Sequence, residues 1–156
     1  MNDIVRRPMC EADLAAVLQI ERDANRFPWS KQNFADCLGD NYQSFVFDAS
    51  GSLVGYLILQ HILDEVHLLN ICVQHQHQGK GIGRYMLDQM IREAQQRQVN
   101  LIVLEVRRSN HRAQQLYIQA GFNEMSIRRG YYPAEQGRED AVLMGMDLSL
   151  SRMFVD

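Results

Sequence analysis

The stretch from Asn70 to Tyr85, NICVQHQHQGKGIGRY, places the strongest constraint on the fold of this chain. It begins with a short apolar run typical of a strand and then delivers three glycines into a helical pattern: Gly79, Gly81 and Gly83. At such a junction the unpaired N–H groups of the first helical turn and the positive end of the helix dipole favour an anion. Glycine also lets the backbone approach phosphate oxygens closely. The stretch therefore predicts a turn that binds a phosphorylated ligand.

Length and composition predict one globular domain over residues 1–156. The chain is 46% hydrophobic and 22% charged, and it contains no low-complexity run that would mark a linker. A net charge of −3 argues against a nucleic-acid partner, because such domains are usually basic. Three widely spaced cysteines favour a reducing compartment. The absence of a signal-like N-terminus or a long apolar run predicts a cytoplasmic protein without a membrane partner.

Hydrophobic periodicity predicts the element order β-α-α-β-β-β-α-β-α-β-β. The expected strands are Ile4–Arg7, Gln43–Asp48, Leu53–Leu63, Val66–Val73, Leu101–Val106, Phe122–Arg128 and Ala141–Leu148. The expected helices are Glu11–Asn25, Lys31–Leu38, Gly83–Gln98 and a short one between the cap Ser109-Asn110 and Gly121. The segment from Arg129 to about Glu139 is expected to be a loop. A strand, a helix and a parallel strand in succession form a βαβ crossover. The predicted fold is α/β, with a mostly antiparallel mixed sheet, a central parallel crossover and flanking helices.

Two common phosphate-binding signatures fail at the glycine turn. A Walker loop needs Ser or Thr after the lysine, but Lys80 is followed by Gly81. A dinucleotide fingerprint needs a third glycine where this chain has Arg84 or Met86. The pattern that does match is Q-x-x-G-x-G, which runs from Gln78 to Gly83.

That pattern resembles the coenzyme A pyrophosphate loop of the GNAT N-acetyltransferases. LEVRRSNHRAQQLYIQAGF, from Leu104 to Phe122, is similar to the second half of the same core. The segments FPWS, LDE, NICV, IRRGYYP and GREDAVLM resemble the bacterial RimI type of this family. The resemblance implies a GNAT fold, acetyl-CoA as cosubstrate without a metal, and transfer to the N-terminal alanine of a small-subunit ribosomal protein. The partner would then be a basic N-terminal peptide.

The resemblance also indicates which residues contact the coenzyme. These are Ile71, Cys72, Val73, Gln78, Gly79, Lys80, Gly81, Ile82, Gly83, Arg84 and Asn110. The chain departs from the family at Gln78, where many members have Arg, at Gly79, where a basic residue is common, and at Cys72, which replaces a smaller residue. Lys80 and Arg84 are expected to compensate for the lost basic side chains. Asn110 either holds the pantetheine arm, caps a helix, or does both.

Two residues are candidates for proton transfer. Glu105 is the only ionisable residue in the apolar run LIVLEV, so a partly buried general base is one interpretation. The other is a strand carboxylate that faces solvent or pairs with Arg107 or Arg108. Tyr117 is either an aromatic of the core or a general acid. The resemblance implies that Glu105 is the base and Tyr117 the acid, with a backbone N–H near Val73 stabilising the oxyanion during direct transfer.

Other side chains have competing interpretations. Cys72 is expected to be a buried, inert thiol rather than a nucleophile, because no activating base is evident. His61, His67, His75 and His77 are expected to be polar loop residues, although His75 and His77 with Cys72 form an alternative metal set. The loops are expected to present a peptide groove through Asp64, Glu65, Tyr131, Tyr132 and Glu139. The alternative functions are acetylation of other protein N-termini or lysines, and acyl-CoA binding without catalysis.

Overall fold

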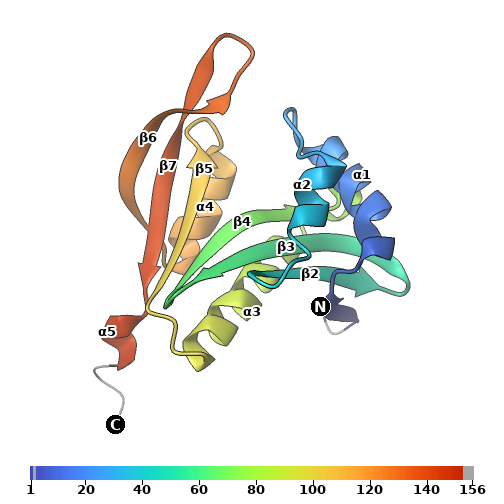
Figure 1. Cartoon of the computed structure of the whole chain (residues 1–156), viewed down its shortest axis with the longest axis horizontal. Coiled ribbons are helices and arrows are strands. Elements are labelled where there is room, and N and C mark those ends of the chain that lie inside the picture. Colours follow the sequence, from blue (N-terminus) through green and yellow to red (C-terminus); the bar gives the residue numbers. More distant parts are fainter. Residues whose placement is uncertain (2, 153–156) are drawn as a thin grey trace. The chain divides into compact units, whose positions relative to one another are not determined.

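The computed structural model describes Met1 and residues 3–152. The strands of this part are β1 Ile4–Pro8, β2 Tyr42–Ala49, β3 Ser52–Ile62, β4 Glu65–Val73, β5 Leu101–Arg107, β6 Asn123–Pro133 and β7 Arg138–Asp147. The helices are α1 Leu14–Ala24, α2 Lys31–Asp36, α3 Ile82–Gln96, α4 His111–Ala120 and α5 Ser149–Arg152, with 3-10 turns η1 Glu11–Asp13 and η2 His75–His77 (Figure 1). The predicted order is confirmed, with α5 added after the last strand.

The strands are hydrogen-bonded in the order β1-β2-β3-β4-β5-β7-β6. The pairs β1–β2, β2–β3, β5–β7 and β6–β7 are antiparallel. β4 and β5 are parallel, and their pairing joins residues 65–68 to residues 101–104. α3 connects them, as expected of a βαβ crossover. The prediction of a mostly antiparallel α/β sheet with one central parallel crossover is therefore confirmed.

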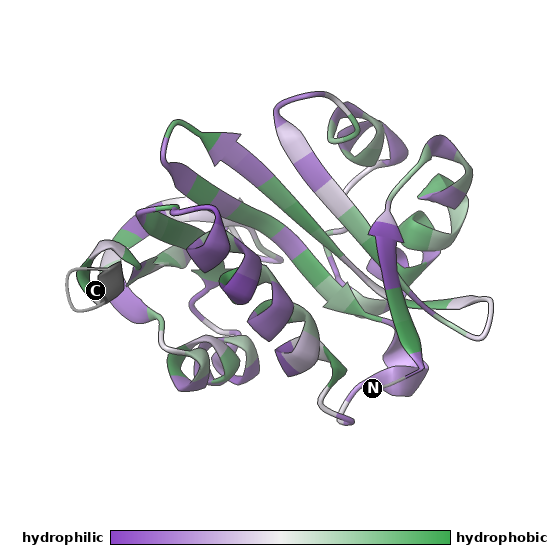
Figure 2. Cartoon of the chain, turned by 90° about the horizontal axis from the view of Figure 1, so that it is seen from below, coloured by the Kyte–Doolittle hydropathy of each residue, from purple (hydrophilic) through white to green (hydrophobic). Residues whose placement is uncertain are grey.

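The chain divides into two compact units, which are described separately. Unit 1 consists of Met1–His61 and Leu69–Met86, and unit 2 consists of Ile62–Leu68 and the chain from Leu87 onward. β4 and α3 each contribute residues to both units. In Figure 2 the helices carry hydrophobic and hydrophilic residues together, as amphipathic helices do.

The core of unit 1 packs α1 and α2, which lie beside each other in Figure 1, with residues of β2, β3 and β4. Its buried side chains include Val17, Phe34, Val46, Tyr56 and Cys72. Trp29 packs against this core with its ring centroid 5.1 Å from that of Phe34, whereas Phe27 is exposed. Of these two neighbouring aromatics, only Trp29 contributes to the core.

A buried glutamate ties several segments of unit 1 together. Glu21 on α1 is only 2% exposed, and its carboxylate accepts hydrogen bonds from the hydroxyl of Tyr56 on β3 and from the amide of Asn70 on β4. It also accepts from the Asn25 side chain at 2.9 Å and from the Trp29 backbone N–H at 2.9 Å. These donors satisfy the buried charge. They also fix the segment after α1 relative to the strand that leads into the glycine turn.

Unit 2 is built around β5, whose residues alternate between buried and partly buried. Ile102, Leu104 and Val106 are buried, while Val103 and Glu105 point to the other face. β6 and β7 form a long hairpin beside β5 (Figure 1). The prediction of a loop from Arg129 to about Glu139 is wrong, because β6 continues to Pro133 and β7 begins at Arg138. After a register shift that follows Arg128, Tyr132 and Pro133 pair with Glu139 and Arg138, so the strand continues past the glycine.

Candidate active site

The glycine turn lies in unit 1 and has the predicted strand–turn–helix form. β4 ends at Val73, η2 spans His75–His77, and α3 begins at Ile82. Gly79 and Gly81 have φ values of +79° and +82°, a region that residues with a Cβ rarely adopt. Their positive φ values turn the backbone into the first turn of α3, where N–H groups without an intrahelical partner are available to an anion.

The side chain of Gln78 closes this turn. Its Nε2 donates to the carbonyl oxygen of Val73 at 3.1 Å, so it bridges the end of β4 and the residue before the glycines. Lys80 is exposed, and Arg84 lies in the first turn of α3. The positively charged side chains near the turn are therefore Lys80 and Arg84. Gln78 instead hydrogen-bonds the backbone of Val73, one of the residues that the family resemblance assigns to coenzyme binding.

Cys72 lies on the last part of β4 and is 8% exposed. Burial, together with the nearby Glu21 carboxylate, raises the pKa of Cys72 to about 11, against a weaker opposing effect of a hydrogen bond with Tyr56. A thiol with this pKa is almost entirely protonated at neutral pH, and a protonated thiol is a poor nucleophile. This supports the expectation that Cys72 is an inert strand residue.

Glu105 lies in unit 2, and its carboxylate contacts two basic side chains. Its Oε2 is 2.5 Å from Nε2 of His67 on β4, and its Oε1 is 3.4 Å from Nε of Arg128 on β6. The carboxylate side chain is only 8% exposed. Glu105 is therefore a largely buried carboxylate with one oxygen held closely and the other in a looser contact.

The alternative that Glu105 pairs with Arg107 or Arg108 is wrong. Arg107 donates to Glu139 at 3.1 Å, and Arg108 is 3.5 Å from Asp140. Both arginines reach carboxylates on β7, the strand that pairs with β5. The expectation that His67 is a loop residue is also wrong, since it lies within β4.

Tyr117 lies on α4, is 7% exposed, and packs its ring 5.9 Å from that of Phe122. Tyr117 and Glu105 both influence the ionisation of Tyr132 on β6. Burial and the neighbouring Tyr131 raise the pKa of Tyr132, and Glu105 and Tyr117 add to the rise. The guanidinium of Arg107, 4.5 Å from the Tyr132 ring centroid, opposes it. Glu105 and Tyr117 therefore share Tyr132 as a neighbour within unit 2.

Asn110 is the N-cap of α4. Its side-chain oxygen accepts from the backbone N–H of Ala113 at 3.1 Å, and Gly121 ends the helix with φ of +112°. Both caps were predicted from sequence. The cap uses the amide oxygen of Asn110, so the amide nitrogen is the part of the side chain suited to contact a ligand.

The residues expected to form an acidic peptide groove lie mainly on strands. Tyr131 and Tyr132 lie on β6, Glu139 on β7 and Glu65 at the start of β4, while Asp64 lies in the turn before it. Hydrogen bonds from Ser109 and then from Arg107 hold the pKa of Glu139 below its usual range. Asp64 accepts a hydrogen bond from the side chain of Asn100. Glu139 and Asp64 thus bind neighbouring residues of unit 2.

The alternative metal set consists of His75, His77 and Cys72. In Met1 and residues 3–152, no three His, Cys, Asp or Glu side chains are grouped so that they hold a metal ion. His61 lies on β3, where its Nε2 is 2.7 Å from the Gln43 amide oxygen. Within the same described part of the chain, no helix combines the length and hydrophobicity needed to cross a bilayer.

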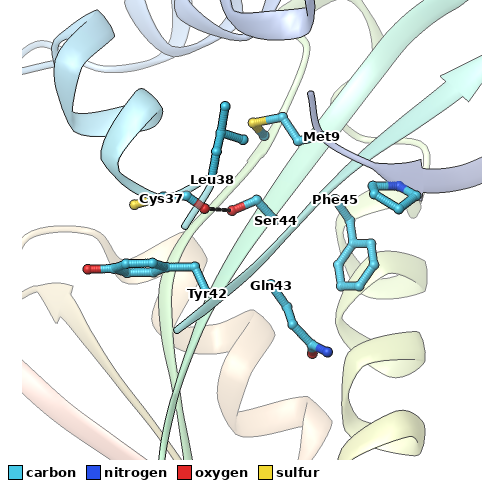
Figure 3. Close-up of a pocket in the computed structure, with 8 residues that line it drawn as sticks. Met9, Cys37, Leu38, Tyr42, Gln43, Ser44 and Phe45 are labelled. Atoms are coloured by element: carbon cyan, nitrogen blue, oxygen red, sulfur yellow. Dashed lines mark hydrogen bonds between the residues drawn. The ribbon is translucent and has the colours of Figure 1, made fainter. Parts of the chain in front are cut away.

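A cavity of about 260 Å³ lies in unit 1, and none of its lining residues is a predicted site residue (Figure 3). It is lined by Pro8, Met9, Cys37, Leu38, Tyr42, Gln43, Ser44 and Phe45. The Ser44 hydroxyl donates to the Cys37 carbonyl oxygen at 2.8 Å across its wall. Burial raises the pKa of Cys37, which disfavours the reactive thiolate form.

Comparisons with known proteins agree on the family. A model described as the Acetyltransferase (GNAT) family matches residues 14–122. The chain is 44% identical over 138 residues to the ribosomal protein bS18-alanine N-acetyltransferase of Escherichia coli strain K12, covering 88% of this chain and 93% of the relative. It is 37% identical to the enzyme of the same name from Haemophilus influenzae, covering 85% and 90%.

A solved structure supports the same assignment. The crystal structure of the ribosomal-protein-S18-alanine N-acetyltransferase from Escherichia coli matches with a TM-score of 0.88 and 41% identity, covering 94% of each chain. The expected GNAT fold is therefore confirmed. The chain belongs to the acetyltransferase (GNAT) family, an enzyme family that uses acetyl-CoA, and within it to the RimI type.

Proposed function

We propose that this protein transfers the acetyl group of acetyl-CoA to the N-terminal alanine of ribosomal protein bS18, as one acetyltransferase domain acting in the cytoplasm. The observation that carries this proposal is the 44% identity, over 88% of the chain, to an enzyme named for that reaction. A likeness of this extent includes both the glycine turn and the segment with Glu105 and Tyr117. The acceptor is then a basic N-terminal peptide.

In this proposal the glycine turn holds the coenzyme. The backbone N–H groups from Gly79 to Arg84 bind the pyrophosphate, and Lys80 and Arg84 add positive charge. Gln78 keeps the turn closed through its bond to Val73, and Ile71 to Val73 form the strand along which the pantetheine lies. Asn110 contributes its amide nitrogen while its oxygen caps α4.

Transfer then requires proton movements at the attacking nitrogen and at the leaving sulfur. Glu105 takes a proton from the N-terminal ammonium, and the neutral nitrogen attacks the thioester carbonyl carbon. A backbone N–H near Val73 stabilises the oxyanion. As the carbon–sulfur bond breaks, the Tyr117 hydroxyl donates its proton to the leaving sulfur, and the nitrogen releases its second proton to solvent, from which Tyr117 is reprotonated. The protonated state of Cys72 favours this direct transfer over an acyl-enzyme.

A thiol-release assay with acetyl-CoA tests the acceptor. We expect saturable turnover with a peptide that begins Ala-Arg and carries the bS18 N-terminal sequence. Two matched peptides serve as controls: one with a blocked N-terminus, and one with a blocked N-terminus and an internal lysine. Turnover of the lysine peptide alone would contradict the proposed acceptor. Saturable coenzyme binding without turnover of any peptide would contradict catalysis.

A further inference from the structure

The contact between His67 and Glu105 joins two strands of unit 2. His67 pairs in register with Val103, and Glu105 is two residues further along β5 on the same face. The imidazole Nε2 and the carboxylate Oε2 are 2.5 Å apart, close enough for a charge-assisted hydrogen bond. His67 takes no direct part in the proposed reaction.

The two contacts of Glu105 differ in how firmly they hold it. His67 is 23% exposed and reaches one oxygen closely, whereas Arg128 is 50% exposed and lies 3.4 Å from the other oxygen. A half-exposed arginine at that distance contributes little to orientation, because solvent screens it and its side chain is flexible. The partner that orients the carboxylate is therefore His67.

We propose that His67 is a positioning residue for the general base. Its Nε2–H donates to Oε2 of Glu105 and fixes the carboxylate so that Oε1 is presented to the acceptor ammonium. The proposal rests on the assignment of Glu105 as base made above. The imidazole exchanges no proton with the substrate; it holds the carboxylate that does.

The same contact makes the base sensitive to the charge of the imidazole. Neutral imidazole donates one hydrogen bond to Glu105, whereas an imidazolium places a full positive charge beside it and weakens it as a base. Arg128, Tyr131 and Tyr132 on β6 are further titratable groups near the carboxylate.

The experiment compares His67→Leu with His67→Gln, using kcat, KM for acetyl-CoA, the pH dependence of kcat and the thermal unfolding temperature. Leucine removes the donor. Glutamine can place an amide N–H near the position of Nε2 but does not titrate. We expect His67→Leu to lower kcat roughly 10- to 100-fold, in line with the cost of misplacing a catalytic group, with KM for acetyl-CoA unchanged. His67→Gln should recover most of kcat, because the amide N–H replaces the imidazole donor.

His61→Leu is the matched control, because His61 is also a strand histidine whose Nε2 contacts a side-chain oxygen, at 2.7 Å. It should leave kcat and the pH profile unchanged. An unaltered kcat in His67→Leu would overturn the proposal. Equal losses in both His67 variants, with a matching fall in unfolding temperature, would also overturn it, since they would indicate a structural role alone. A wild-type protein that acetylates no alanine peptide would instead contradict the proposed function.

Discussion

Replacing Tyr117 with phenylalanine is expected to slow acetyl transfer by about 10²-fold or more, in line with the contribution of a general acid. The substitution removes only the hydroxyl that protonates the leaving sulfur. The ring stays, and with it the packing against Phe122, whose ring centroid is 5.9 Å away. Coenzyme affinity and the unfolding temperature should therefore remain close to those of the wild type.

Single-turnover transfer to the Ala-Arg peptide, together with a separate measurement of acetyl-CoA binding, checks this prediction. Tyr42→Phe is a suitable control, because Tyr42 is a partly buried tyrosine that lines the cavity in unit 1. Near-normal turnover in Tyr117→Phe with retained coenzyme binding would remove Tyr117 as the acid and leave it as a core aromatic.

Glu105→Gln is expected to lower the rate about 10²-fold or more at neutral pH and to shift the remaining activity toward high pH. The amide cannot accept the proton of the acceptor ammonium. An N-terminal amine loses that proton unaided as the pH rises through about 8, so the need for a base disappears there. The variant should therefore approach the wild-type rate under alkaline conditions.

Rate profiles of kcat from neutral to alkaline pH measure this shift. Glu93→Gln on α3 is the control, since Glu93 forms an i,i+4 ion pair with Arg97 and has no place in the proposed chemistry. A Glu105→Gln profile with the same shape as the wild type would exclude Glu105 from proton transfer. A rate lost equally at every pH would indicate that the carboxylate is needed for structure alone.

Much of the fold was predictable because its signals are local. Apolar runs, capping residues and turn glycines each act within a few residues, so the element order and the caps Asn110 and Gly121 could be predicted from sequence. The crossover followed from a strand, a helix and a buried strand in succession. Both strands β6 and β7 were predicted, but their extension to Pro133 and from Arg138 was missed, because the segment that begins Arg129-Gly130 and ends at Pro133 suggested a loop.

The partners of Glu105 could not be predicted in the same way. His67 is 38 residues away in sequence, and it meets Glu105 only because β4 and β5 pair in parallel in one register. A shift of that register by one residue would place the two side chains on opposite faces. The neighbouring arginines are the obvious partners of Glu105 in the sequence, yet the pairing of β5 with β7 brings them to Glu139 and Asp140. The identity of a side chain's partner thus depends on sheet register, which a single sequence does not encode locally.

The buried carboxylate of Glu21 shows the same limit of prediction from sequence. A glutamate on an amphipathic helix is usually exposed, but Glu21 accepts hydrogen bonds from three elements or segments of unit 1. Its donors come from residues as far away as Asn70, so only the folded chain shows that the charge is satisfied. Helical periodicity places Glu21 on the inward face of α1, but it does not show which donors satisfy the buried carboxylate.

Mass spectrometry of intact ribosomal proteins, from cells with and without the gene for this chain, tests the central claim most directly. We predict that bS18 carries one N-terminal acetyl group only when the gene is present. Wild-type protein should restore that group, while Glu105→Gln and Tyr117→Phe should restore it incompletely. An unchanged acetylation state of bS18 in cells without the gene would contradict the proposed function.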